Sequence, residues 1–192
     1  MISLQDSSDL THFASTNLIE HGLLHGFLGR DFVAPPSDTV QISESFRDSF
    51  GYPLTLLHQV HGNVCVDESS QWEGGKALPE GDAFLFSRYS RDPRAFGVKT
   101  ADCVPVVLVG ERYCAVIHAG WRGLAAGILG KVSHQLAEHE DLRGVKALIG
   151  PAAGKDEYEV GLEVVQAIGS QAEYSSISHS KVLLDLEGTA RN

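Results

Sequence analysis

The sequence is short of basic residues. Its 192 residues contain 15 Lys and Arg against 25 Asp and Glu, which gives a formal net charge of −10. A protein that binds a nucleic-acid backbone needs a basic surface that releases counterions, so we expect no nucleic-acid partner. A small anionic ligand held in a local pocket is still compatible with this charge.

Cysteine is also scarce, and its spacing is uninformative by itself. The three thiols are Cys65, Cys103 and Cys114, an odd number without a CxxC pair, which argues against a disulfide framework and a zinc finger. Apolar runs long enough to cross a bilayer are missing, and residues 1–13 lack the basic start and apolar core of a signal peptide. We therefore expect a cytoplasmic protein with reduced thiols and no membrane partner.

The chain has enough apolar residues for one full core. Hydrophobic residues make up 43% and charged residues 21%, as in ordinary globular proteins. We predict a single α/β domain over residues 1–192, with a mixed β-sheet flanked by helices. Residues 1–20 are polar and weakly patterned, so we expect them to be loosely ordered or to form one loose strand.

The most informative stretch runs from Gly97 to Gly123. Val104–Val109 and Tyr113–Ile117 are short, largely β-branched runs that predict two buried strands, and the three residues between them fit a hairpin. Cys103 directly precedes the first strand and His118 follows the second. Reactive side chains therefore lie where strands end.

The six residues HAGWRG (118–123) predict a turn from strand to helix, with the helix running from about Leu124 to His139. Gly120 and Gly123 would let a ligand approach the backbone, and the helix N-terminus would favour an anion such as phosphate or a carboxylate. A cysteine or histidine beside a strand is more often a structural residue than a ligand. From the residues alone, both interpretations of Cys103 and His118 stay open.

Other elements follow from hydrophobic spacing. His58 and His61 are three residues apart, which places them on opposite faces of a strand, so we expect only one of them to face a site. The remaining predictions are helices at Gln41–Phe50 and Leu162–Ile168, strands at His25–Arg30, Gly81–Phe86 and Gly144–Gly150, two strands in Leu54–Val66 broken at His61–Asn63, and a helix or strand from Lys181.

Six blocks, in this order, resemble the YfiH-like family, whose members are also called laccase-domain or multicopper polyphenol oxidase proteins, purine nucleoside phosphorylases of that type and peptidoglycan editing factors. The blocks are HQVHG (58–62), GDA (81–83), TADCVP (100–105), HAGWRG (118–123), IGP (149–151) and YEVG (158–161). The resemblance implies one metal, zinc or alternatively copper, held by His61, Cys103 and His118. A Cys-His-His set with an open fourth position is the form expected of catalytic zinc.

The resemblance also implies an enzyme of purine nucleosides. Its expected reactions are phosphorolysis of nucleosides, including methylthioadenosine, and hydrolytic deamination of adenosine. We expect phosphate near the HAGWRG turn, where arginine suits it through bidentate hydrogen bonds, although Arg122 could equally be a surface ion-pair residue. The predicted substrate-binding residues are Arg30, Gln59, Gly120 and Gly123. The predicted catalytic residues are Cys103, His118, Arg122 and Asp82, the last as an acid that moves protons.

Three other functions remain open at this point. An amidase that edits muropeptide precursors would use Cys103 as nucleophile and His118 as base. A copper polyphenol oxidase would need several His-rich ligand sets, whereas the resemblance assigns only His61 and His118, of the nine histidines, as ligands. A non-catalytic binding module is the third. We expect a monomer or homodimer, and a family domain that continues beyond the Asp185–Asn192 segment.

Overall fold

The computed structural model describes residues 2–7, 10–15, 25–29, 32, 38–68, 78–91 and 93–192. Contacts divide the chain into two compact units, residues 1–55 with 93–95 and residues 56–92 with 96–192. Within the described residues, no helix has the length and hydrophobicity that crossing a membrane requires. One domain over residues 1–192 stays a prediction.

The first unit begins with paired strands, where the sequence predicted loose order or one strand. Strands β1 (Ile2–Ser7) and β2 (Leu10–Ser15) are antiparallel, with Leu4 opposite Phe13, and β3 (Phe27–Leu28) pairs with β2. The prediction was wrong about the number of strands because their stability depends on pairing with one another, which a weak local pattern does not reveal.

Helix α2 (Thr39–Phe50) confirms the predicted amphipathic helix and starts two residues earlier than expected. Asp38 caps it: its side chain accepts from the Gln41 backbone N–H at 2.8 Å, and the Gln41 side chain reaches back to the Asp38 N–H at 3.4 Å. Gly51 ends the helix in the left-handed conformation, at φ 76°. The helix leads into β4 (Leu54–Thr55), which pairs with β7 (Ala95–Phe96).

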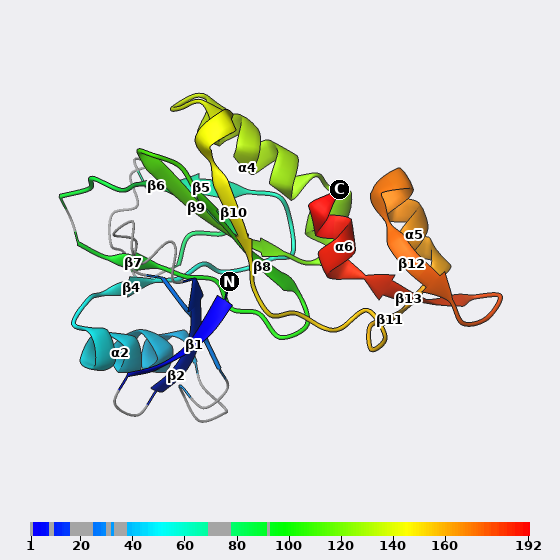
Figure 1. Ribbon diagram of the computed structural model, residues 1–192, viewed down its shortest axis with the longest axis horizontal. Helices are drawn as coiled ribbons and strands as arrows, with labels where there is room; N and C mark the ends of the chain where they lie inside the picture. The colour runs from blue at the N-terminus through cyan, green and yellow to red at the C-terminus, as the bar shows by residue number, and fades with distance from the viewer. Residues whose placement is uncertain are drawn as a thin grey trace. The chain divides into compact units, whose positions relative to one another are not determined.

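The second unit is built on a five-stranded sheet in the order β10-β8-β9-β6-β5 (Figure 1). Neighbouring strands are antiparallel except β5 and β6, which are parallel, so the predicted mixed sheet is confirmed. The five strands are β5 (Cys65–Asp67), β6 (Ala83–Ser87), β8 (Val104–Val109), β9 (Tyr113–Ala119) and β10 (Lys146–Ile149).

The central hairpin forms as predicted from its apolar runs. Val109 lies opposite Cys114 in the β8–β9 register, and the Gly110 N–H donates to the Tyr113 carbonyl at 2.9 Å. The Glu140 carboxylate stabilises the turn, accepting from the backbone N–H of Glu111 at 2.6 Å and of Tyr113 at 2.8 Å. The turn is therefore held by a side chain that lies far away in the sequence.

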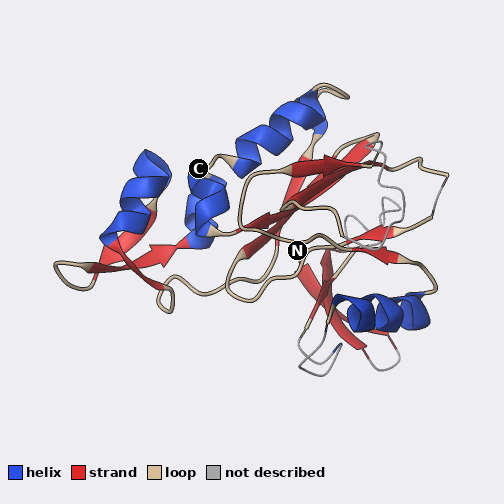
Figure 2. Cartoon of the chain, turned by 180° about the vertical axis from the view of Figure 1, so that it is seen from behind, coloured by secondary structure: helices blue, strands red, loops and turns tan. Residues whose placement is uncertain are grey.

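The predicted helix from Leu124 to His139 is wrong in one respect, because it is two helices. Helix α3 (Trp121–Ala125) is followed by α4 (Ile128–Ala137), and Gly127 between them adopts the left-handed conformation, at φ 74°. Helix α4 buries residues four apart, Ile128, Val132 and Leu136, at 0% exposure, and it covers a face of the sheet over β9, β6 and β5 (Figure 2).

The C-terminal part adds a small sheet in the order β11-β13-β12. The predicted helix at Leu162–Ile168 is confirmed, and the segment from Lys181 is a strand that passes into a helix at Leu186. The elements of this part are the 3-10 turns Leu142–Gly144 and Gly169–Gln171, β11 (Glu159–Gly161), α5 (Leu162–Ile168), β12 (Glu173–Ser176), β13 (Lys181–Asp185) and α6 (Leu186–Arg191).

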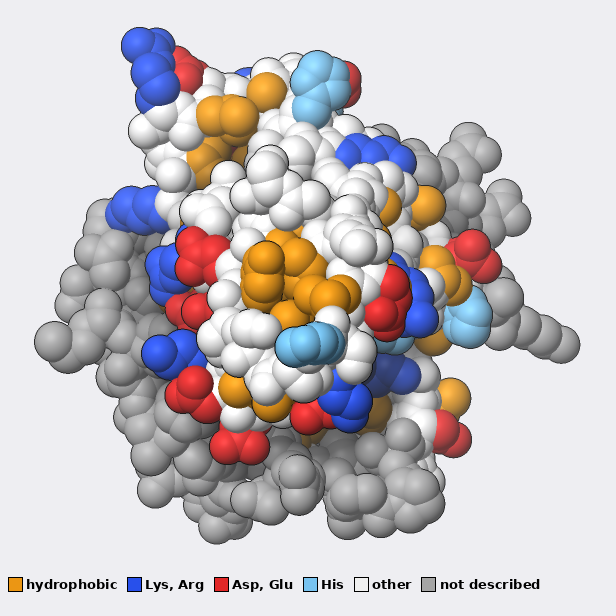
Figure 3. Space-filling view, turned by 90° about the vertical axis from the view of Figure 1, so that its right-hand side faces the viewer, with side chains coloured by type: hydrophobic (Ala, Val, Ile, Leu, Met, Phe, Trp, Pro, Cys, Tyr) orange, Lys and Arg blue, Asp and Glu red, His pale blue; other side chains and the backbone are white. Residues whose placement is uncertain are grey.

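On the face that Figure 3 shows, acidic and basic side chains are interspersed around a small apolar group.

Candidate metal centre

Three side chains from distant parts of the sequence meet at one end of the central hairpin. His61 lies in the loop between β4 and β5, Cys103 directly precedes β8, and His118 is the penultimate residue of β9. One ligand atom from each lies within 4.8 Å of the others. Ligand atoms around a tetrahedral zinc ion are roughly 3.4–3.8 Å apart, given bonds of 2.0–2.3 Å. A small inward movement of these side chains would therefore hold an ion.

His118 is buried and oriented by a carboxylate. Its side chain has 3% exposure, and its Nδ1 lies 2.9 Å from Oδ1 of Asp82, which is fully buried. Burial lowers the pKa of His118, and the hydrogen bond to Asp82 opposes this only in part. The imidazole is therefore neutral near pH 7, which is the form that binds a metal.

His61 projects its ring toward the site from a left-handed turn. Its φ of 58° is the only positive value at a non-glycine residue in the described part of the chain. Its ring centroid lies 4.7 Å from that of His118, at an interplanar angle of 84°. His58 is exposed and forms an isolated bridge with Glu80. This confirms the expectation that only one of the two histidines faces the site.

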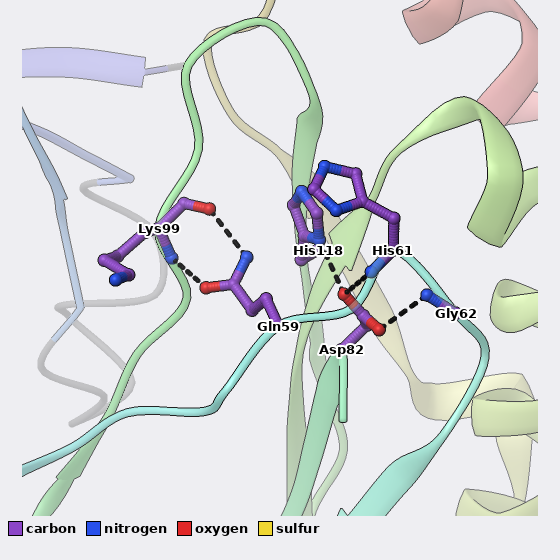
Figure 4. A network of polar contacts seen from close by, with 6 residues as sticks. All are labelled: Gln59, His61, Gly62, Asp82, Lys99 and His118. Atoms are coloured by element: carbon purple, nitrogen blue, oxygen red, sulfur yellow. Dashed lines mark hydrogen bonds and ion pairs between the residues drawn. The ribbon is translucent and has the colours of Figure 1, made fainter. Parts of the chain in front are cut away.

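The same carboxylate fixes the backbone of this turn. The backbone N–H of His61 donates to Oδ1 of Asp82 at 3.0 Å, and that of Gly62 donates to Oδ2 at 2.7 Å (Figure 4). Both carboxylate oxygens are thus occupied by protein donors. The role of Asp82 as an acid that moves protons stays a prediction.

Cys103 is half-buried, and its environment disfavours the thiolate in the metal-free chain. Burial raises the pKa of the thiol, and the nearby carboxylates of Asp102 and Asp82 raise it further. A cation placed among the three side chains would reverse this preference, because a coordinating thiol loses its proton. The donor set therefore fits a metal better than it fits an isolated thiol nucleophile.

Two of the predicted substrate-binding residues, Gln59 and Gly123, contact other parts of the protein. The Gln59 side chain pairs with the backbone of Lys99, donating from Nε2 to the carbonyl at 2.8 Å and accepting from the N–H at 2.7 Å (Figure 4). This pairing links the loop of His61 to the segment that precedes Cys103. Gly123 in α3 lies directly against the backbone of Gly62. Substrate contacts by Gln59 and Gly123 stay predictions.

The remaining residues predicted to bind substrate or phosphate are Gly120, Arg122 and Arg30. Gly120 lies between β9 and α3, against the three candidate ligands. Arg122 is exposed, and its guanidinium carbon lies 4.3 Å from the centroid of the Trp121 ring. Arg30 lies outside the described residues. Contacts of Arg122, Gly120 or Arg30 with phosphate stay predictions.

Sequence reasoning missed two residues near the site. The Asn63 side chain donates to the Ala126 carbonyl at 2.7 Å and so ties the turn after His61 to the end of α3. Tyr158 has a pKa raised by burial, and then by Cys103 and Asp102, which places it near the cluster. Both belong to or adjoin the quoted sequence blocks, but no local pattern distinguishes them from surface residues.

A model of the family described as multi-copper polyphenol oxidoreductase laccase matches residues 35–192. The chain belongs to this family. The chain is similar to the Escherichia coli protein named purine nucleoside phosphorylase YfiH, which is 34% identical over 142 residues, covering 70% of this chain and 55% of the relative. The chain thus spans about half the length of this relative.

Two further comparisons, one of sequence and one of structure, are consistent with this family assignment. A prokaryotic protein named adenosine deaminase RL5 is 43% identical over 74 residues, covering 37% of this chain and 28% of the relative. A crystal structure of a Neisseria meningitidis protein superposes with a TM-score of 0.70 at 26% identity, covering 99% of this chain and 81% of that one. The predicted resemblance to YfiH-like proteins and the mixed α/β fold are thereby confirmed.

Proposed function

We propose that this chain is a zinc-dependent enzyme that cleaves purine nucleosides with phosphate, and that adenosine deamination is a second reaction of the same site. The observation that carries the proposal is the cluster of His61, Cys103 and His118. The names of the relatives, purine nucleoside phosphorylase and adenosine deaminase, supply the substrate class.

The chain's own residues prepare this chemistry. His118 is held neutral, with Nδ1 directed at Asp82, so that Nε2 is the nitrogen available to a metal. Cys103 would contribute a thiolate and His61 a second imidazole. A zinc ion held by these three groups would supply a Lewis acid and an acidic bound water. Arg122 belongs to the HAGWRG block, is exposed, and is our candidate for contacting phosphate.

The amidase alternative is less well supported by the electrostatics of the site. A nucleophilic cysteine normally has a lowered pKa, stabilised by a neighbouring cation such as an imidazolium. Here the pKa of Cys103 is raised and that of His118 is lowered, so the metal-free pair stays a neutral thiol and a neutral imidazole. That state suits metal ligands better than a thiolate nucleophile.

The copper oxidase alternative requires more ligands than the described residues provide. Multicopper electron transfer needs several His-rich sets, and the described part of the chain contains one cluster of three potential ligands. The family description alone therefore does not favour oxidase chemistry here. A non-catalytic binding module remains the alternative to an enzyme, and the following experiment separates the two.

The test combines metal content with turnover. Metal is measured by mass spectrometry on the wild type, on Cys103→Ala and on the control Cys65→Ala, whose half-buried thiol lies outside the cluster. Adenine release from adenosine is followed with and without phosphate, and inosine formation is followed in parallel. We expect about one zinc per chain, lost together with activity only in Cys103→Ala. A metal-loaded wild type that turns over neither reaction would contradict the proposal.

A further inference from the structure

Asp82 carries a buried carboxylate that hydrogen-bonds to groups of the candidate metal centre. It has 0% exposure. Its Oδ1 contacts His118 Nδ1 at 2.9 Å and accepts from the His61 backbone N–H at 3.0 Å, and its Oδ2 accepts from the Gly62 N–H at 2.7 Å. One side chain therefore contacts two of the three candidate ligands, one through the ring and one through the backbone.

The contact with His118 selects one form of its ring. A neutral imidazole carries one proton, on either Nδ1 or Nε2. A carboxylate is an acceptor, so it favours the tautomer in which Nδ1 carries the proton and leaves the lone pair on Nε2 for a metal. The backbone supports this orientation, because the His118 N–H donates to the Asp82 carbonyl at 2.7 Å.

The contact with His61 holds an unfavourable backbone. Residues other than glycine rarely adopt a left-handed conformation, and they do so where the surroundings stabilise it. At His61 the stabilising group is the Asp82 carboxylate, which receives two successive backbone N–H groups from the turn. Without that acceptor the turn would relax, and the ring of His61 would leave the cluster.

We infer that Asp82 is the positioning residue of the metal centre, setting the tautomer of His118 and the backbone conformation of His61 together. The inference rests on the metal site of the proposed function and replaces the proton-moving role that the sequence suggested. A carboxylate with no exposed surface acts through the ligands that it holds.

The variant Asp82→Asn tests this because an amide has one acceptor oxygen where the carboxylate has two. If the amide nitrogen faces Gly62, two donors meet and the turn of His61 loses a hydrogen bond. If the nitrogen faces His118, it donates to Nδ1 and shifts the ring proton to Nε2, where a metal would bind. In either orientation we expect zinc affinity to fall by about 10- to 100-fold.

The experiment has two readouts that need no nucleoside. Zinc affinity is measured by competition with a chromophoric chelator, and the tautomer of His118 is read from ¹⁵N–¹H correlations of the metal-free chain at pH 8. The His118 signals are assigned by their loss in His118→Ala. The control is Asp185→Asn, which changes a partly buried carboxylate that accepts the Gly188 N–H at 2.7 Å and is not a member of the ligand cluster.

We expect the Nδ1–H tautomer and tight zinc in the wild type and in Asp185→Asn, and weakened zinc in Asp82→Asn. An Nε2–H tautomer in the wild type would overturn the inference even if Asp82→Asn fails to fold. Unchanged affinity in a folded Asp82→Asn, or a wild type that binds no zinc, would overturn it as well. A wild type that binds zinc but leaves nucleosides intact would contradict the proposed function alone.

Discussion

Gly120 lies so close to Cys103 that a Cβ atom at position 120 would come within 3.0 Å of Sγ. The same Cβ would lie 3.2 Å from Cδ2 of His61 and 3.8 Å from Cε1 of His118. The backbone of Gly120 has φ −78° and ψ 164°, which any residue can adopt. Lack of space beside the three ligands, and not backbone conformation, therefore excludes a side chain here.

Gly120→Ala should consequently weaken metal binding more than it weakens the fold. The added methyl group would displace Sγ by a few tenths of an ångström or push the ring of His61 outward, and we expect zinc affinity to fall on the order of tenfold. Zinc competition and thermal unfolding measure the two effects. The control is Gly130→Ala in α4, where a Cβ would meet nothing within 4 Å. Equal zinc affinity in the two variants would contradict this prediction.

Gly123→Ala should act chiefly on the fold. A Cβ there would lie 2.8 Å from the carbonyl oxygen of Gly62, and a contact with backbone is not relieved by a rotamer change. We expect a loss of about 1–3 kcal/mol in the free energy of unfolding, because α3 and the turn after His61 must separate. Urea denaturation of the metal-free chain measures it, again against Gly130→Ala. A stability equal to wild type would show that the two turns are not packed together.

The central hairpin and the ligand set could be predicted from the sequence, for different physical reasons. Strands Val104–Val109 and Tyr113–Ala119 are consecutive and joined by a short turn, so their pairing is a local property. The meeting of His61 with Cys103 and His118 is not local, and only the resemblance to a family indicated it. The number of residues that separate these three side chains along the sequence does not indicate how far apart they lie in the fold.

The supporting contacts could not be predicted, because each depends on a partner that the local pattern does not contain. From the sequence we predict Asp82 as an acid that moves protons, and only the structure shows its carboxylate beside His118 and His61. The expected helix is broken at Gly127, which adopts the left-handed conformation directly before α4. The pairing of β1 with β2 likewise depends on tertiary context, which overrides weak local propensity.

Gln59→Ala should loosen the connection between two ligand segments. The variant removes both hydrogen bonds to the Lys99 backbone, at 2.8 and 2.7 Å, which together contribute about 1–2 kcal/mol at a partly exposed position. We expect a modest loss of stability and a few-fold loss of zinc affinity. Gln166→Ala, at an exposed position in α5, is the control. If Gln59 instead contacts substrate, KM would rise while zinc affinity stays unchanged.

Alkaline pH should destabilise the fold through Cys114, which is fully buried in β9. Burial is the main cause that raises the pKa of this thiol from 9.0 to about 11, although the nearby Arg88 lowers it. Between these two values the unfolded chain has lost a proton that the folded chain keeps. Unfolding is therefore favoured as pH rises, and the stability that the neutral thiol provides at pH 8 is lost progressively above pH 9.

The measurement compares wild type with Cys114→Ala, in which the titrating group is absent. Substitution costs stability at every pH because it leaves a cavity, but that cost does not depend on ionisation. We expect the difference in unfolding free energy between the two proteins to shrink on the order of 1–2 kcal/mol between about pH 8 and pH 10.5, as urea denaturation in reductant would show. Groups common to both proteins cancel in this difference. Parallel pH curves would mean that the thiol at position 114 ionises in the folded chain as readily as in the unfolded one.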